Sequence, residues 1–429
     1  MSREHEIFLE TADFLGVRLC RDAIWAGKRC NWVGACVLER EGHPPTPARR
    51  ACGADLYAGT SGIAAFLGCL YASTGEKIFR ITAEGAIRQA LSRLDDFAPA
   101  SRSSLYTGLT GVAYILVNLA EIFGTEMFAA MALLILEEVC KDEPEGQRPE
   151  ALTGSAHAIP ALLKIHQKRP EDFLLETALR HGARLLSAVS EAAEGGPLPN
   201  SPALPHYPDR GLARGAAGCA LALLELYGAT RELRFLRAAE QAFQIVYDEP
   251  GAAHPDPAGP HVTSVTTGRD VVKPAGAAAW YDGASGVGLA RLRAYELTRE
   301  RLHLLEAEAA LRTTAAVLSD VPPTSDVSSP EGREDFSLAH GLTGVAELPL
   351  CFSYMLGGGS HRALAEGIGR RGIELYRNDD LPWPCGVPGG EETPGLMSGL
   401  AGIGYFYLRL HDVSQNPSLL LVSTERGAR

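Results

Sequence analysis

Four polar side chains stand at or beside a position directly before a glycine, and their chemical types can move protons or stabilise anions. His340, Arg214 and Asp282 each precede a glycine, and Tyr281 precedes Asp282. An imidazole can act as a general acid and base, and a phenol can donate to a developing oxyanion. A guanidinium can lower the pKa of a nearby acid or steady an anion. These four residues are the candidate catalytic residues.

Each candidate also has a structural explanation. His340 can be a purely structural histidine, and Tyr281 can be a bulky residue whose role is to fill space. Asp282 can cap the helix that follows it, or it can orient His340. Arg214 can form a bidentate pair with a carboxylate.

The glycines belong to a motif that recurs seven times and positions these side chains. Six copies read Gly-x-x-Gly, and the third has His157 in place of the second glycine. The first glycines of the copies are Gly59, Gly108, Gly154, Gly215, Gly283, Gly341 and Gly399. Such spacing indicates a repeat architecture, in which one unit cannot bury its apolar face without its neighbours.

Each motif is followed by an apolar run that predicts a helix packed on most sides, as at 219–227. A second, amphipathic helix is expected between motifs. Residues 234–247 are an example, with Phe235, Ala238, Ala242 and Ile245 at helical spacing. Two glycines three residues apart share a helix face and allow another backbone segment to approach closely. The sequence therefore predicts an all-α fold, an (α/α)₇ toroid of seven inner and seven outer helices.

We expect three segments along the chain. Residues 1–50 form an N-terminal helical and rim segment, residues 51–415 form the toroid, and residues 416–429 form a C-terminal tail. The stretch Trp25–Gly34 is expected to pack as a rim element, with Cys30 buried and unreactive. Only residues 262–272 resemble a strand.

Composition excludes several classes of function. The chain has 429 residues and a net charge of −12, which argues against nucleic-acid binding. No run approaches the roughly 18 apolar residues of a membrane span. The charged N-terminus lacks an apolar signal core, and the nine cysteines form no CxxC pair. We therefore expect a cytoplasmic protein with reduced cysteines.

With its seven motifs in register from about Leu56 to His411, the sequence resembles the lanthionine synthetase C-like family. The resemblance implies an α/α toroid. It also implies a cyclase that adds a peptide cysteine thiol to a dehydroalanine or dehydrobutyrine of the same lanthipeptide precursor. Metal-dependent members of the family bind zinc through a Trp-Cys-x-Gly motif in the fifth repeat and a Cys-His-Gly motif in the sixth.

This chain departs from the family at the zinc ligands. Tyr281 stands in place of the first cysteine and Ala339 in place of the second, so only His340 remains. The fourth repeat has Arg214 where family cyclases have a histidine. Because a catalytic zinc site needs about three protein ligands, we expect no metal and no other cofactor. The pattern is similar to a zinc-free branch of the family.

The sequence leaves two main functions open. The first is a zinc-independent, lanthionine-forming cyclase that acts on a ribosomally made precursor peptide after a separate dehydratase or a kinase and lyase. His340 would then move the thiol and enolate protons, and Arg214 would attract the thiolate. The second is a catalytically silent scaffold that binds the precursor or its modifying enzymes. A toroid glycosidase ranks last, because Asp282 is the only clear inward carboxylate.

Overall fold

The structure is a computed structural model that describes residues 3–40, 43–141, 150–193, 211–213, 215–245, 278–320, 334–378 and 381–423. Arg214 and the predicted strand at 262–272 lie outside these residues.

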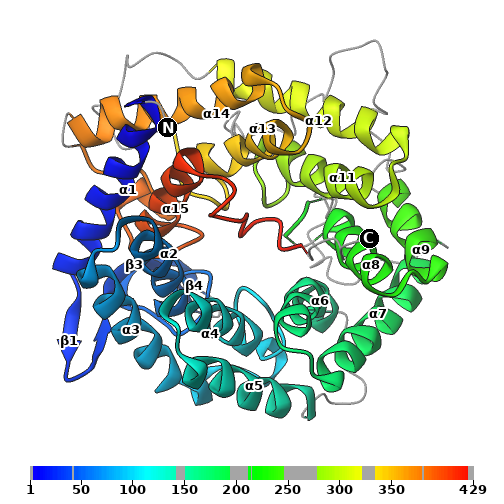
Figure 1. Ribbon diagram of the computed structural model, residues 1–429, viewed down its shortest axis with the longest axis horizontal. Helices are drawn as coiled ribbons and strands as arrows, with labels where there is room; N and C mark the ends of the chain where they lie inside the picture. Colours follow the sequence, from blue (N-terminus) through cyan, green and yellow to red (C-terminus); the bar gives the residue numbers. More distant parts are fainter. Residues whose placement is uncertain are drawn as a thin grey trace.

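The described helices form two concentric rings (Figure 1). The inner ring consists of α2 (Thr60–Thr74), α4 (Leu109–Phe123), α6 (Glu150–Lys168), α8 (Ala216–Thr230), α11 (Ala284–Thr298), α13 (Leu342–Leu356) and α15 (Leu400–His411). The outer ring consists of α3 (Lys77–Leu91), α5 (Glu126–Lys141), α7 (Asp172–Ala193), α9 (Leu233–Ile245), α12 (Arg301–Ser319), α14 (Gly359–Gly372) and α1 (Arg3–Arg21). The predicted toroid of seven inner and seven outer helices is confirmed. Short helices η1 (Leu94–Asp96), η2 (Pro99–Ser101), η4 (Ile373–Asn378) and η5 (Pro388–Gly390) lie in the connections.

The two ends of the chain close the ring. Six inner helices pack against the outer helix that follows them, but α15 packs against α1 at the opposite end of the sequence. Phe8 of α1 is fully buried, and its ring centroid lies 6.3 Å from that of Tyr407 in α15. The imidazole of His411 also lies 3.0 Å from the His5 carbonyl oxygen. The first helix therefore supplies the outer helix of the last repeat.

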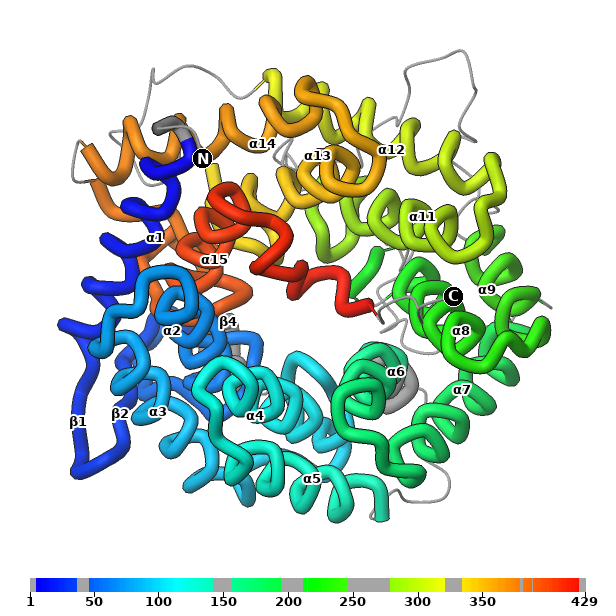
Figure 2. Tube along the Cα trace, viewed as in Figure 1, coloured from blue at the N-terminus to red at the C-terminus, as the bar shows by residue number. Residues whose placement is uncertain are grey.

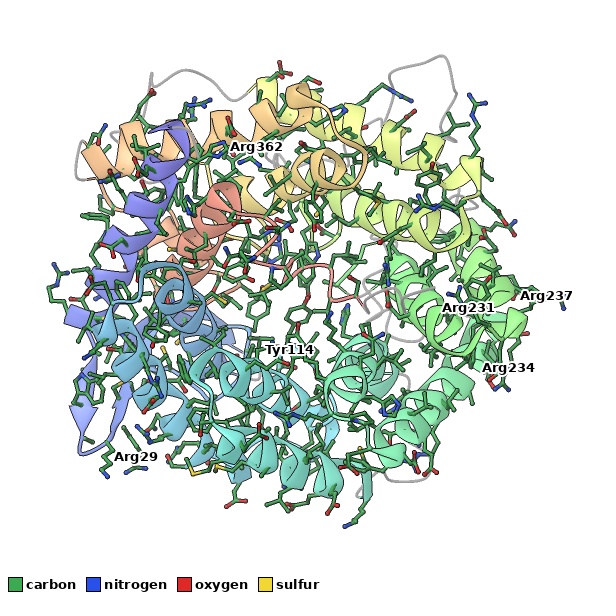
Figure 3. The ribbon with its side chains drawn as sticks, viewed as in Figure 1. Arg29, Tyr114, Arg231, Arg234, Arg237 and Arg362 are labelled. Carbon is green, nitrogen blue, oxygen red and sulfur yellow. The ribbon has the colours of Figure 1, made fainter. Side chains whose placement is uncertain are left out.

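Inner and outer helices differ in burial as their sequences predict. In α8, every residue from Ala216 to Leu226 is buried. In α9, Phe235, Ala238 and Ala242 are buried on one face. Figure 3 shows Tyr114 on the inner side of the ring and the labelled arginines of α9 at its outer edge. None of the described helices is both long and apolar enough to cross a membrane.

The second glycine of the motif allows close contact with the chain just before its own helix. A Cβ on Gly344 would lie 1.9 Å from the carbonyl oxygen of Leu338, six residues earlier. The same relation recurs at Gly62, Gly111, Gly218, Gly286 and Gly402, each against the carbonyl oxygen six residues before it. The expected close approach of backbone is therefore present, and the approaching segment is the loop that leads into the helix. No side chain larger than hydrogen fits there without moving that loop.

Backbone hydrogen bonds join the motifs around the ring. In five of the seven repeats, the residue two positions before the first glycine donates its N–H to the carbonyl of the equivalent residue in a neighbouring repeat. These hub hydrogen bonds run from Tyr57 to Tyr106 (2.9 Å), Ala213 to Tyr281 (3.1 Å), Tyr281 to Ala339 (3.2 Å), Ala339 to Met397 (2.8 Å) and Met397 to Tyr57 (2.7 Å). They hold the N-terminal ends of successive inner helices at fixed distances from one another.

The third motif departs from the others. Helix α6 begins at Glu150, so Gly154 lies inside the helix, whereas Gly108 and Gly341 lie directly before theirs. His157, in place of the second glycine, has its Nε2 atom 2.8 Å from the Leu212 carbonyl oxygen. The imidazole therefore occupies the place where the other repeats have only a hydrogen atom, and it bridges to the fourth repeat.

Two antiparallel hairpins follow α1, and the sequence did not predict them. Strands β1 (Ile24–Ala26) and β2 (Arg29–Asn31) form the first, and β3 (Val33–Arg40) and β4 (His43–Ala51) form the second. Gly27, with φ of +61°, permits the tight turn between β1 and β2. The expected packing role of this region is seen at Trp32, which is 2% exposed and donates from Nε1 to the Leu19 carbonyl.

After α15 the chain turns back and enters the ring (Figure 2). Residues 417–423, the C-terminal segment, form neither helix nor strand. Their apolar side chains from Leu419 to Val422 are nevertheless buried. The segment therefore packs inside the ring as irregular chain.

Candidate active site at the N-terminal ends of the inner helices

The structure brings Tyr281 and His340 together from adjacent repeats. Their ring centroids lie 4.6 Å apart, with the planes inclined by 40°. The hub hydrogen bond from Tyr281 N–H to Ala339 C=O fixes the two loops side by side. Both side chains are half-buried, so each retains contact with solvent. The pair thus lies where free N–H groups at helix N-termini favour anions.

Asp282 lies beside this pair at the entrance to α11. Its side chain is exposed, yet the surrounding protein removes enough water to raise the pKa of the carboxyl group. The charge of His340 acts in the opposite direction and lowers this pKa, as does a hydrogen bond with the backbone N–H of Asp282 itself. Asp282 is therefore close enough to His340 for their charges to interact, as one of its two predicted roles requires.

Arg214 lies outside the described residues, but the backbone just before it reaches the site. Ala213 donates its N–H to the Tyr281 carbonyl at 3.1 Å. A Cβ on Gly211 would lie 2.1 Å from the same oxygen, so only glycine fits at this approach. The predicted catalytic role of Arg214 stays a prediction.

The side chains at this site do not provide the ligands that bind zinc in metal-dependent members of the family. Ala339 carries a methyl group and is fully buried, and Tyr281 places its phenol ring against His340. One imidazole cannot supply the roughly three protein ligands that a catalytic zinc requires. Among the described residues, three potential ligands do meet at Glu240, Glu300 and His303, but these lie in the outer ring.

That outer cluster is an ion-pair network. His303 is fully buried, and its Nδ1 atom lies 3.0 Å from Nη1 of Arg291. A guanidinium can only donate, so Nδ1 accepts and Nε2 carries the ring proton in the neutral imidazole. Nε2 lies 2.9 Å from a carboxylate oxygen of Glu240. Nδ1 therefore has a protein donor, whereas Nε2 lies close to a carboxylate but makes no hydrogen bond with it.

Sequence reasoning missed two aromatic residues next to the pair. Tyr106 and Trp280 are buried, and their ring centroids lie 5.4 Å apart with the planes inclined by 72°. Trp280 also contacts Tyr281 at 6.3 Å between centroids, and Tyr106 contacts His157 at 5.4 Å. A continuous row of aromatic rings therefore runs from the third repeat to His340. Alignment of the repeats could have revealed Tyr106, which occupies the motif position of Tyr281.

Cys30 has the environment of an unreactive thiol. It is 1% exposed, and its Sγ donates to the Thr82 carbonyl at 3.4 Å. Burial raises the pKa of the thiol to about 12, so it stays protonated at neutral pH. This agrees with the expectation that Cys30 is buried and inert.

Comparison with known proteins agrees with the architecture. The model of the family described as lanthionine synthetase C-like protein matches residues 51–421. Among solved structures, nisin cyclase is similar, with a TM-score of 0.59 and 16% sequence identity, over 86% of this chain and 92% of that one. No curated protein matches in a search by sequence. The family match covers most of the sequence, and the chain belongs to the lanthionine synthetase C-like family.

Proposed function

We propose that this chain is a zinc-independent peptide cyclase that joins a cysteine thiol to a dehydroalanine or dehydrobutyrine in a lanthipeptide precursor. The observation that carries the proposal is the contact between Tyr281 and His340, at 4.6 Å, in a member of this family. Nisin cyclase, which is similar in fold, is named for the same class of reaction. The proton-transfer groups here stand where the family's zinc ligands would otherwise be.

The reaction needs one proton transfer in each direction. Neutral His340 takes the proton from the substrate thiol, and the thiolate attacks the β-carbon of the dehydro residue, forming the C–S bond. The π electrons of the C=C bond move onto the adjacent carbonyl, giving an enolate to which the Tyr281 phenol donates. The imidazolium then returns the proton to the α-carbon. No electrons are lost or gained overall, so no oxidant or reductant is required.

Confinement would compensate for the absence of zinc. A free thiol has a pKa near 8.5, so only a few per cent is thiolate at neutral pH. Holding thiol and alkene together can contribute effective molarities of about 10⁵ M or more. Arg214, which precedes α8 by two residues in the sequence, would raise the thiolate fraction further. Asp282 would orient His340.

The substrate would reach this site already dehydrated. A separate dehydratase, or a kinase and lyase, would convert serine and threonine into the dehydro residues. We place the reaction in the cytoplasm, and nine free cysteines support a reducing compartment.

A scaffold that binds the precursor without catalysis is the second candidate. The observation that favours it is the C-terminal segment, which packs inside the ring close to the site, with Trp280 donating to the Leu420 carbonyl. In this case the chain would hold a precursor peptide or partner enzymes, and Tyr281 would fill the place of a lost ligand.

Cyclisation of a dehydrated peptide distinguishes the two candidates. The substrate is a synthetic peptide with one cysteine and one dehydroalanine, and mass spectrometry after thiol alkylation counts the remaining thiol. We expect His340→Ala to slow the reaction by about 10²-fold or more, because it removes the proton carrier. Tyr281→Phe should slow it by about 10²- to 10³-fold, as loss of an oxyanion donor does.

Two matched variants serve as controls. Tyr354 is 63% exposed at the end of α13, and His361 lies on the outer helix α14. Tyr354→Phe and His361→Ala make the same chemical changes away from the site and should leave the rate unchanged. A wild-type rate equal to that without protein would favour the scaffold. A catalysed rate that neither site variant lowers would refute the assigned residues.

A further inference from the structure

The C-terminal segment is held mainly through its backbone carbonyls, by side chains from three different repeats. Tyr106 Oη donates to Leu419 C=O at 2.9 Å, and Trp280 Nε1 donates to Leu420 C=O at 3.1 Å. Tyr405 Oη donates to Pro417 C=O at 2.6 Å. Three aromatic donors therefore bind carbonyl oxygens of one irregular stretch of chain.

The donors are held in place by their packing against each other. Tyr106 and Trp280 are buried and pack edge to face against each other. Burial raises the pKa of the Tyr106 phenol, so this group stays protonated and can donate. Carbonyl groups are common to all peptides, so these donors recognise a peptide backbone without regard to its sequence. The apolar surroundings that bury Leu420 and Leu421 add a preference for apolar side chains.

We infer that Tyr106 and Trp280 form a peptide-binding subsite for an apolar peptide segment, and that residues 417–423 are the chain's own occupant of this subsite. The subsite lies directly beside the candidate active site, because Trp280 precedes Tyr281 and their rings are in contact at 6.3 Å. A peptide bound to Trp280 by one carbonyl would place neighbouring residues near Tyr281 and His340.

In this interpretation the C-terminal segment occupies the place of the substrate peptide, and this part of the inference rests on the proposed cyclase function. Binding itself needs no chemistry, so it can be measured with a peptide that has neither cysteine nor dehydro residue. The probe is a fluorescein-labelled peptide with the sequence of residues 417–423, Pro-Ser-Leu-Leu-Leu-Val-Ser. Fluorescence anisotropy reports its binding to the full-length chain.

The perturbation is Leu420→Asp in the full-length chain, which places a carboxylate where Leu420 is 3% exposed and so releases the segment. In the wild type, the tethered segment competes at an effective concentration of the order of millimolar. We expect the Leu420→Asp chain to bind the labelled peptide at least about tenfold more tightly than the wild type. Adding Trp280→Phe, which keeps a ring but removes the donor, should weaken that binding by about tenfold. The control Leu302→Asp, at a leucine that is 58% exposed on α12, should bind like the wild type.

Hydrogen exchange of the wild type gives a test that does not depend on any variant. If the C-terminal segment leaves the subsite reversibly, its amides become exposed to solvent without global unfolding. The amides of Leu420 and Leu421 should therefore exchange faster than those of α15. The inference is overturned if these amides exchange only with global unfolding, or if a folded Leu420→Asp chain gains no affinity. It is also overturned if Trp280→Phe leaves that affinity unchanged. If the chain binds the probe as expected but cyclises no peptide, this inference stands and the proposed cyclase function is refuted. If the chain cyclises the dehydrated peptide but does not bind the probe, the cyclase function stands and this inference is refuted.

Discussion

The second glycine of each motif gives the most direct test of how the sequence builds the site. An alanine Cβ at Gly344 would lie 1.9 Å from the Leu338 carbonyl oxygen, whereas ordinary contact begins at 3.4 Å. The loop would therefore have to move by about 1.5 Å, the difference between these distances. Overpacking costs up to about 3 kcal/mol, and alanine regains about 1 kcal/mol of helix propensity. We expect Gly344→Ala to lower the free energy of unfolding by about 2 kcal/mol.

The same substitution should also affect the reaction, because Leu338 lies in the loop that carries His340. A displacement of about 1 Å at a reacting group can cost about 10²-fold in rate. Urea unfolding followed by circular dichroism gives the stability, and the cyclisation assay gives the rate. The matched control is Gly367→Ala in α14, where a Cβ meets no atom within 4 Å. That variant should gain about 0.5–1 kcal/mol. A Gly344→Ala chain as stable as Gly367→Ala would refute the close-approach explanation of the motif.

Three further predictions test other parts of the account. Arg214→Ala should slow cyclisation by about 10- to 10³-fold, whereas Cys30→Ser, at a buried thiol, should change the melting temperature and not the rate. Phe8→Ala should lower the unfolding free energy by about 3–5 kcal/mol and keep a single transition in calorimetry, because α1 closes the ring; two transitions would contradict this. Asp282→Asn should unfold at higher urea than the wild type at pH 7. The raised pKa of Asp282 means that folding disfavours its charge, so stability falls as pH rises above the ordinary aspartate pKa of about 3.9. The difference in stability between Asp282→Asn and the wild type should vanish below that pH. A difference that does not depend on pH would contradict this explanation.

The sequence predicted the ring because its repeats are local. Each motif and the apolar run after it lie within one stretch of about 20 residues, and their recurrence requires neighbours of the same kind. The position of α1 could not be predicted in this way, since its partner α15 is almost 400 residues away. The hairpins were missed for a different reason. Strand β4 contains Pro44, Pro45 and Pro47, which are unusual in strands and are tolerated here in a two-stranded sheet.

The candidate site was predicted in part. Tyr281 and His340 were chosen by their motif positions and the family resemblance, and the structure places their rings in contact. Tyr106 and Trp280 were missed because their importance comes from contacts between repeats. The C-terminal segment was predicted only as a tail, because no sequence pattern indicates that a carbonyl such as that of Leu420 meets an indole N–H from the fifth repeat.

Cyclisation by the metal-free wild-type chain is the decisive measurement for a zinc-independent reaction. The protein is dialysed against a chelator, its zinc content is measured by elemental analysis, and the dehydrated peptide is added at neutral pH. We predict less than stoichiometric zinc and a ring-closure rate clearly above that of the peptide alone, with His340→Ala reduced towards the uncatalysed rate. A rate equal to that of the peptide alone, or activity that returns only when zinc is restored, would contradict a zinc-independent cyclase.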